Sequence, residues 1–341
     1  MPFDRVQRHA AGAVRRGVSF DRLLSESMID LHHGHDQAVV SPAQHLLFCM
    51  NTVLSAGDAT HALARSGVGQ AYPAIGLRMA LGCASLEGAI QALARLYAHA
   101  STAVRIDLTT DADDAILSVR MDAADDRDAA QLEENYLTWM FMHCLHFLGR
   151  APPISGVTVR DPLHFNQGVL HWGIGGPVDY GAITALRFPR ALLAEPAASR
   201  AGANVQWECH QLWLSYLAER PEASPAEFVG GAGFVRFADI VEHSGVSSNT
   251  LRRQLQSLNG GFREARRRAL TEAAMQRLRA GRDSVEAIAA DLGYSDARSL
   301  RRFLKNATGL TPQEVRSHPT MPGENQAVLI KVKALSEILN V

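Results

Sequence analysis

The sequence lacks paired cysteines. Its cysteines are scattered along the chain and form no Cys-x-x-Cys motif; they are Cys49, Cys83, Cys144 and Cys209. This spacing argues against a disulfide framework and against a structural zinc site, and it fits a reduced compartment. We therefore expect a cytoplasmic protein that binds no metal and no other cofactor.

Long hydrophobic runs are also absent. The stretch MPFDRVQRHAAGAVRRG at 1–17 contains no apolar segment of the signal-peptide type, and the most apolar predicted helix, near 132–148, is interrupted by His143 and His146. That helix is shorter than a membrane span requires. The sequence therefore predicts neither a membrane role nor a secretory one.

No catalytic pattern stands out either. The chain shows no Ser/His/Asp order, no motif of paired carboxylates and no nucleophile elbow. The Gly-rich stretch WGIGGPVDYG at 172–181 is not followed by a helix with a phosphate-binding pattern, so it predicts a turn between strands rather than a nucleotide loop. We predict no enzyme activity and no catalytic residue.

The composition that is present is that of a folded protein with two unlike ends. A chain of 341 residues with 47% hydrophobic and 20% charged residues suggests two globular domains. Residues 229–318 hold 15 Lys and Arg against 9 Asp and Glu, a net +6, whereas residues 1–228 hold 17 against 24, a net −7. The basic end predicts nucleic-acid binding, and the acidic end predicts a domain with a function other than binding nucleic acid.

The acidic part mixes helical and strand patterns. Ser41-Pro42 is a favourable helix start, and hydrophobic residues at helical or alternating spacing follow. Two alternating runs around the acidic turn DADD (111–114) are typical of a β-hairpin. The expected elements are helices over 42–55 and 57–66, a strand over 71–81, a helix over 85–100, hairpin strands VRIDLTT and AILSVRMD, a helix over 128–148, strands SGVTVR and ITALRF, and a helix over 203–219.

The basic part contains a short motif twice. VEHSGVSSNTLRRQL at 241–255 aligns with AADLGYSDARSLRRF at 289–303, and each copy gives a helix, a Gly, a hydrophobic residue, a Ser and Leu-Arg-Arg. No strand is indicated between 234 and 316. The sequence therefore predicts a mixed α/β N-terminal domain followed by an all-α domain. The expected boundaries are 1–220 for an effector or dimerisation domain, 221–233 for a linker, 234–318 for a DNA-binding domain and 319–341 for a C-terminal extension.

Each copy has the pattern of a helix-turn-helix. The Gly allows the turn, the next apolar residue fills the core, Ser caps the second helix, and the outer face of that helix enters the major groove. A helix over 262–280, ~28 Å long at ~1.5 Å per residue, would join the copies and let both sit on one face of DNA. The expected DNA-binding residues are Ser248, Asn249, Arg252, Arg253, Arg298, Arg301, Arg302 and Lys305.

These motifs resemble a known family. IAADLGYSDARSLRRFLKNATGLTPQEVR at 288–316 resembles the second helix-turn-helix and C-terminal signature of AraC/XylS-type transcriptional regulators, and VSSNTLRRQLQSLNGGFREARRRAL resembles the first unit with its linker helix. Within 40–220, AIGLRMALGCASLEGAIQALARLYAHAS is similar to the arabinose-binding-type effector domain of that family, a name that does not fix the ligand. The resemblance implies a sequence-specific DNA-binding regulator.

The N-terminal domain has two interpretations. It could bind a small organic effector in an aromatic pocket, because such pockets combine apolar walls with a few polar groups. The residues expected to line it are Trp139, Met142, His143, Trp172 and Tyr180. Alternatively, the domain only mediates oligomerisation and binds no ligand. The expected partners are double-stranded DNA and a small-molecule effector, with RNA polymerase and a second copy of the chain as further candidates.

Three remaining features leave alternatives open. HHGHD, which contains His32, His33, His35 and Asp36, is more typical of a solvated loop than of part of a metal site. His143, Cys144 and His146 share one helix, where packing in a core or pocket is favoured over metal binding. The tail 319–341 is apolar enough in its last fifteen residues to dock on another surface, which the sequence does not identify.

Overall fold

The computed structural model describes residues 3–29, 40–160, 174, 178–219, 283–308, 311–317 and 322–340, together with six helical positions between 267 and 278. The contacts divide the chain into two units. Unit 1 comprises Met1–Pro221 and Asn325–Val341, and unit 2 comprises Glu222–Glu324. Unit 2 therefore lies in the sequence between two parts of unit 1.

A five-stranded sheet forms the centre of unit 1. Its order is β1-β2-β5-β3-β4, and all neighbouring strands are antiparallel except β3 and β4. The predicted hairpin is confirmed, since β1 and β2 pair from Val104↔Met121 to Thr110↔Ala115. The strands are β1 (Val104–Thr110), β2 (Asp114–Met121), β3 (Gly156–Val159), β4 (Val178–Tyr180) and β5 (Thr184–Pro189).

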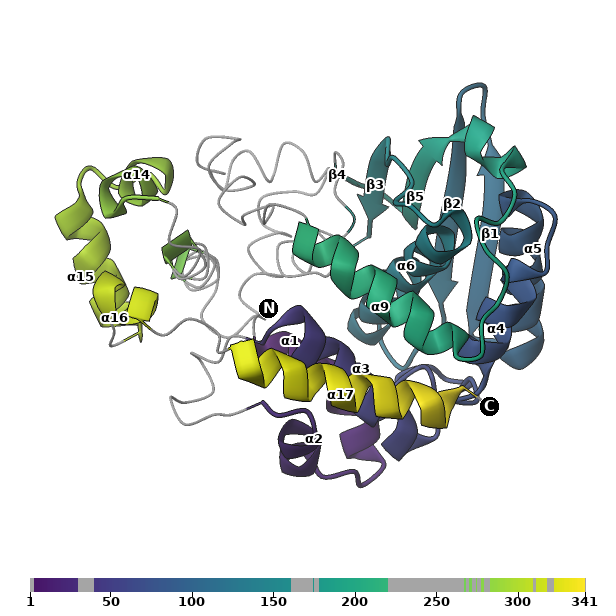
Figure 1. Ribbon diagram of the computed structural model, residues 1–341, viewed down its shortest axis with the longest axis horizontal. Helices are drawn as coiled ribbons and strands as arrows, with labels where there is room; N and C mark the ends of the chain where they lie inside the picture. The colour runs from purple at the N-terminus through teal and green to yellow at the C-terminus, as the bar shows by residue number, and fades with distance from the viewer. Residues whose placement is uncertain are drawn as a thin grey trace. The chain divides into compact units, whose positions relative to one another are not determined.

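Helices cover the sheet and extend beyond it (Figure 1). Two predicted helix starts are confirmed by their caps: Ser41 forms a capping box with Gln44, and the Ser85 side chain accepts the Gly88 amide. The helices of unit 1 before β5 are α1 (Phe3–Arg15), α2 (Phe20–Glu26), α3 (Pro42–Ala56), α4 (Tyr72–Leu81), α5 (Leu86–Ala100) and α6 (Asp126–Leu148). After β5 come the short η2 (Arg190–Ala194), α9 (Val205–Glu219) and, after unit 2, α17 (Pro322–Leu339).

The central helix of unit 1 is α6. The Asp125 side chain caps its start, and Gly149 ends it with a left-handed φ of 64°. It lies between the sheet and α9 (Figure 1), where it contacts β2, β5 and α9. Most of its side chains after the first turn are buried. The buried Glu133 is satisfied by the Met121 amide, the Thr184 hydroxyl and Arg160. Helix α6 therefore carries polar side chains into the interior of unit 1, and this one is fully paired.

The prediction of a strand over 71–81 is wrong, because this segment forms α4. Pro73 stands in the first turn of the helix, where the missing amide hydrogen costs nothing. Buried residues occur at Ala74, Leu77, Ala80 and Leu81, which is helical spacing. A short apolar run satisfies both the helix pattern and the buried-strand pattern, and here the contacts with α5 and α9 select the helix.

The prediction of a helix over 57–66 is also wrong. Gly57 ends α3 with a left-handed φ of 65°, and His61 and Ala62 adopt φ values of 56° and 59° that no right-handed helix allows. One carboxylate oxygen of Asp58 accepts the amides of residues 60 and 68 and the hydroxyl of residue 60. These bonds close a compact turn segment over 57–69 instead of a helix.

The C-terminal helix α17 packs on unit 1. Val328, Val332 and Leu339 are buried in one cluster with residues of α3, including Leu47 and Met50. Further polar contacts fix the helix, since Lys331 donates to the Glu26 carbonyl and Asn340 donates to the Ala203 carbonyl. The surface on which the tail docks is therefore formed by the α3 and α9 region of unit 1.

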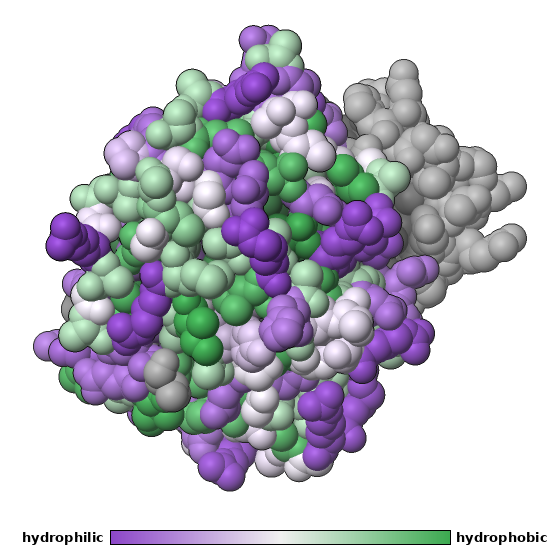
Figure 2. All heavy atoms as spheres, turned by 90° about the vertical axis from the view of Figure 1, so that its right-hand side faces the viewer, coloured by the Kyte–Doolittle hydropathy of each residue, from purple (hydrophilic) through white to green (hydrophobic). Residues whose placement is uncertain are grey.

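The outer surface of unit 1 mixes polar and apolar residues. Figure 2 shows the face that carries α5 and β1, where hydrophilic and hydrophobic residues are interspersed. Large hydrophobic side chains that are exposed include Ile75 on α4 and Ile330 on α17. Among the residues that the structure describes, no helix is both long and apolar enough to cross a membrane.

Candidate functional site

The second predicted helix-turn-helix lies within the described part of unit 2. Helix α14 (Val285–Asp291) is followed by Gly293, whose φ of 75° takes the backbone through the turn. Helix α15 (Ala297–Thr308) comes next. The ring of Tyr294 packs against Phe303 at 5.3 Å between ring centroids. Gly293 therefore has the left-handed backbone, and Tyr294 the packing, expected for a turn between two helices.

The cap of α15 differs from the prediction. The Ser299 amide donates to the Asp296 carboxylate at 2.7 Å, whereas the Ser295 hydroxyl donates to that same carboxylate rather than capping the helix. These hydrogen bonds to the charged form lower the pKa of Asp296, with the Ser299 amide contributing most. A carboxylate caps the helix because it also interacts favourably with the helix dipole.

The two faces of α15 are chemically opposite. Leu300 and Leu304 are fully buried in a core with Leu278 and Ile288, as the sequence predicts. The expected DNA-binding residues of this helix are all exposed; they are Arg298, Arg301, Arg302 and Lys305. Arg301 forms an ion pair with Glu286 of α14 at 3.3 Å, and the other three form no ion pair among the described residues. This face therefore presents positive charge of which, among the described residues, only that of Arg301 has an internal partner.

A third helix, α16 (Pro312–Ser317), follows α15 and closes this core through Val315. The first helix-turn-helix, with Ser248, Asn249, Arg252 and Arg253, lies outside the described residues, as do the histidines of HHGHD at 32–36. The helix predicted over 262–280 is helical at the described positions, and its Leu270, Ala274 and Leu278 belong to the core of unit 2.

Three of the predicted effector-binding residues lie on α6. The indole of Trp139 donates to the Tyr97 hydroxyl at 2.9 Å, and its ring meets the ring of His143 edge-on at 4.8 Å. Met142 is buried, and its carbonyl accepts from the Cys209 thiol of α9. Trp172 and the side chain of Tyr180 lie outside the described residues.

His143 is the least satisfied polar side chain of this cluster. It is only 3% exposed, and neither ring nitrogen has a hydrogen-bond partner among the described residues. Burial, with a further contribution from nearby His146, lowers the pKa of His143 to about 3. The ring is therefore neutral at pH 7 and offers one donor and one acceptor that the described residues do not use.

A second buried histidine connects this cluster to α17. The ring of His210, on α9, lies 6.0 Å from that of Trp139, and its Nδ1 is 3.0 Å from the Ser336 hydroxyl. That hydroxyl donates to the Val332 carbonyl, so the His210 Nδ1–H donates to the hydroxyl. Burial lowers the pKa of His210 to about 3, so this ring is neutral as well.

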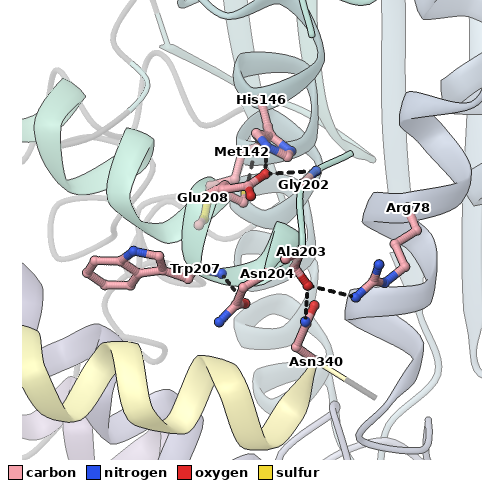
Figure 3. Close-up of polar contacts among 10 residues, drawn as sticks. Arg78, Met142, His146, Gly202, Ala203, Asn204, Trp207, Glu208 and Asn340 are labelled. Carbon is pink, nitrogen blue, oxygen red and sulfur yellow. Dashed lines mark hydrogen bonds and ion pairs between the residues drawn. The ribbon is translucent and has the colours of Figure 1, made fainter. Parts of the chain in front are cut away.

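Polar contacts at the start of α9 hold these elements together (Figure 3). The Glu208 carboxylate accepts the Gly202 amide and lies 3.9 Å from His146. The Ala203 carbonyl accepts from both Arg78 of α4 and Asn340 at the end of α17. The segment 202–204 therefore ties α4, α6, α9 and α17 to one another.

Sequence reasoning missed the residues that other elements contribute to this cluster. Tyr97 comes from α5, His210 from α9 and Ser336 from α17, and only the fold brings them next to α6. No spacing in the sequence links positions so far apart. The residues on α6 could be predicted from the sequence, because Trp139 and His143 are four residues apart and share a helix face.

Two family models match the chain. Residues 17–197, which are 181 of 341, match the N-terminal arabinose-binding domain of AraC transcription regulators. Residues 240–318 match a helix-turn-helix domain. The chain belongs to the AraC family of transcription regulators. The resemblance inferred from the motifs is confirmed, and so is the combination of a mixed α/β N-terminal domain with a helical C-terminal region.

As an AraC regulator the chain is a DNA-binding transcription regulator, and its family is not one of enzymes. Among solved structures, the chain is similar to the transcriptional regulator CdpR from Pseudomonas aeruginosa, with 18% identity over 93% of this chain and 97% of that one. The TM-score of 0.28 is too low for this likeness to support an argument. A comparison with curated proteins finds no match.

Proposed function

We propose that this AraC regulator reads DNA with the exposed basic face of α15 and changes its DNA affinity when a small effector binds beside His143. The observation that carries the second part is the burial of a neutral imidazole whose two nitrogens have no partner among the described residues. A buried polar group without a hydrogen bond costs about 1–3 kcal/mol, which a ligand with a matching donor or acceptor recovers.

The ligand class follows from the surroundings of His143. Trp139 and His210 supply aromatic surface, and Tyr97 adds a hydroxyl. Such surroundings favour a small organic molecule that is largely apolar and carries one hydrogen-bonding group. A strongly charged ligand is disfavoured, since His143 and His210 are both neutral.

The connections of unit 2 offer a route for coupling. Helix α9, which carries His210, is the last described helix of unit 1 before unit 2, and α17, which carries Ser336, follows unit 2. The hydrogen bond between these two residues links both connections beside Trp139. An effector that moves the His210 ring acts on both segments at once. A coupling of ~1–3 kcal/mol would change operator affinity roughly 5- to 150-fold.

The test uses the full-length chain. Genome-wide footprinting first supplies an operator, and a panel of small metabolites is then screened by thermal shift. We expect one class of compound to raise the melting temperature and to shift operator affinity over the same concentration range. His143→Leu should abolish both effects, whereas His99→Leu, at an exposed histidine of α5, should leave both unchanged.

Two outcomes contradict the proposal. If His143→Leu responds to the compound as the natural chain does, the effector binds elsewhere. If no compound changes either the melting temperature or the operator affinity, the N-terminal domain is an oligomerisation module, and sedimentation of the full-length chain should then show a dimer that no metabolite alters.

A further inference from the structure

Four metal-ligating side chains from three segments of unit 1 lie close together, away from the effector cluster. His9 lies on α1, His45 and Cys49 lie one turn apart on α3, and His61 lies in the turn segment 57–69. The ligand atoms of His9, Cys49 and His61 are all within 4.8 Å of one another. The rings of His9 and His45 are in edge contact at 4.8 Å between centroids.

Two measured distances match the edges of a tetrahedral metal site. The Cys49 sulfur lies 3.4 Å from His9 Nδ1 and 3.5 Å from His45 Nε2. With Zn–N bonds of ~2.0 Å and a Zn–S bond of ~2.3 Å, nitrogen and sulfur ligands at the tetrahedral angle are ~3.5 Å apart. His61 is within reach as a further ligand, since its ligand atom lies no more than 4.8 Å from those of His9 and Cys49.

The Gln131 side chain of α6 contacts the ring of His9. The Gln131 amide nitrogen is 3.1 Å from His9 Nε2, while the Gln131 amide oxygen is buried without a hydrogen-bond partner. The Gln131 nitrogen also donates to the Asn135 amide oxygen at 3.0 Å, and the Asn135 amide nitrogen has no partner among the described residues. Turning both amides by 180° keeps a bond between them and brings the Gln131 oxygen to the same ring nitrogen, which then carries the hydrogen. His9 Nδ1 thereby keeps its lone pair toward Cys49, as a metal ligand requires.

The backbone is shaped to bring His61 to this place. His61 and Ala62 both have left-handed φ values, and a Cβ added to Gly12 of α1 would lie 2.4 Å from their backbone atoms. Only a glycine at position 12 lets α1 approach the turn segment so closely. Left-handed backbone at residues other than glycine is common at functional sites.

The chemistry of His61 also suits a ligand. It is 7% exposed, and its Nδ1 has no hydrogen-bond partner among the described residues. The buried Asp58 carboxylate beside it offsets part of the charge that a divalent ion brings.

We propose that His9, His45, Cys49 and His61 bind one Zn²⁺ ion, which joins α1, α3 and the turn segment. Three imidazoles and one thiolate favour zinc over Mg²⁺ or Ca²⁺, which prefer oxygen ligands. All four positions are supplied by the chain, so the site is structural and leaves no position open for catalysis. The ion stabilises the part of unit 1 on which α2 and α17 also pack.

The test is metal binding by the full-length chain after removal of metal with a chelator. One equivalent of Zn²⁺ should bind and raise the melting temperature by roughly 5–10 °C at a hundredfold excess over Kd, and Mg²⁺ should do neither. Co²⁺ should give a thiolate-to-cobalt charge-transfer band. That band distinguishes this site from histidine clusters without a cysteine, such as HHGHD.

Matched variants decide the assignment. Cys49→Ser and His61→Asn should abolish the band and the zinc-dependent rise in melting temperature. Cys83→Ser, at another half-buried cysteine, and His99→Asn should keep both. A metal-free Cys49→Ser chain that melts at the temperature of the metal-free natural chain shows that the variant folds. If that variant still gives the band, or if zinc does not stabilise the natural chain, the proposal is wrong.

Discussion

Helices α15 and α6 place their polar side chains in opposite environments. Helix α15 buries Leu300 and Leu304 and leaves its arginines in water, whereas α6 is enclosed on nearly every side and keeps polar residues such as His143 inside unit 1. A charged group is inexpensive at an exposed position and costly at a buried one. The arginines therefore present their charge to a polyanion, whereas burial keeps the rings of His143 and His210 neutral.

The exposed helix and the buried helix should therefore respond to different solution conditions. The exposed face of α15 acts through charge, so its binding should depend on salt. The cluster around His143 consists of buried neutral rings in aromatic contact, so the stability of unit 1 should depend on pH. Three substitutions in α15 and one change of pH test this difference, and they are given from the largest expected effect to the smallest.

The largest effect is expected from the inner face of α15. Leu300→Ala removes a fully buried side chain and should lower the free energy of unfolding of unit 2 by about 2–5 kcal/mol. Hydrogen exchange at the amides of α15 measures this loss directly. Arg302→Ala, two positions along and exposed, should change the same exchange rates little. Equal losses in the two variants would mean that α15 does not have the described orientation.

Acid should destabilise unit 1 through His143 and His210. The pKa of each ring is about 3 in the folded chain against 6.5 in the unfolded one, so the unfolded chain binds more protons between these values. The stability that the neutral rings contribute is complete above pH ~6.5 and is lost as the pH falls below it. We expect a loss of about 2 kcal/mol between pH 6.5 and 5.5.

Urea unfolding at several pH values tests this expectation. His143→Leu should remove about half of the dependence attributed to the two rings, whereas His99→Leu should leave it unchanged. A natural chain with the same unfolding free energy at pH 6.5 and 5.5 would show that these rings are not buried in the neutral form.

Substitutions on the outer face of α15 should change the free energy of DNA binding and leave the free energy of unfolding nearly unchanged. Arg298→Ala is expected to weaken operator binding by about 1–3 kcal/mol if the guanidinium contacts a base, and to leave the melting temperature nearly unchanged. Arg95→Ala removes an exposed arginine of α5 in unit 1 and serves as the control in fluorescence-anisotropy titrations. Natural affinity in both Arg298→Ala and Arg302→Ala would remove α15 from the interface.

The smallest effect concerns salt. Lys305→Ala should reduce the slope of log affinity against log salt by about 0.9 if the ammonium neutralises one phosphate. Binding measured from low to moderate salt gives the slope for the natural chain and the variant. A slope unchanged by Lys305→Ala, with weaker binding at every salt concentration, would indicate a contact other than one with phosphate.

Local patterns were sufficient where one residue decides the local structure. Ser41 and Ser85 start their helices by accepting a nearby amide, and Gly293 is required by its left-handed backbone, so these features could be predicted from the sequence. The same holds for the outward arginines of α15, because burial of the leucines fixes the opposite face.

Local patterns failed where distant contacts decide. The run 71–81 fits a strand as well as a helix until α5 and α9 pack against it, and the turn segment 57–69 depends on Asp58 reaching the amide of residue 68. The scattered cysteines gave no indication of a metal site, although His45 and Cys49 have the i, i+4 spacing that places two ligands on one helix face. Their partners His9 and His61 come from separate segments.

The docking of α17 on α3 also affects how the chain folds during synthesis. Synthesis reaches Pro322 roughly 270 residues after the end of α3, and at ~5–20 residues per second this interval is about 13–55 s. During that interval the hydrophobic face of α3 around Leu47 and Met50 has no cover from the helix that buries it in the finished chain. The nascent protein therefore carries an aggregation-prone surface until α17 has been synthesised, and a premature stop codon before α17 would leave that surface exposed permanently.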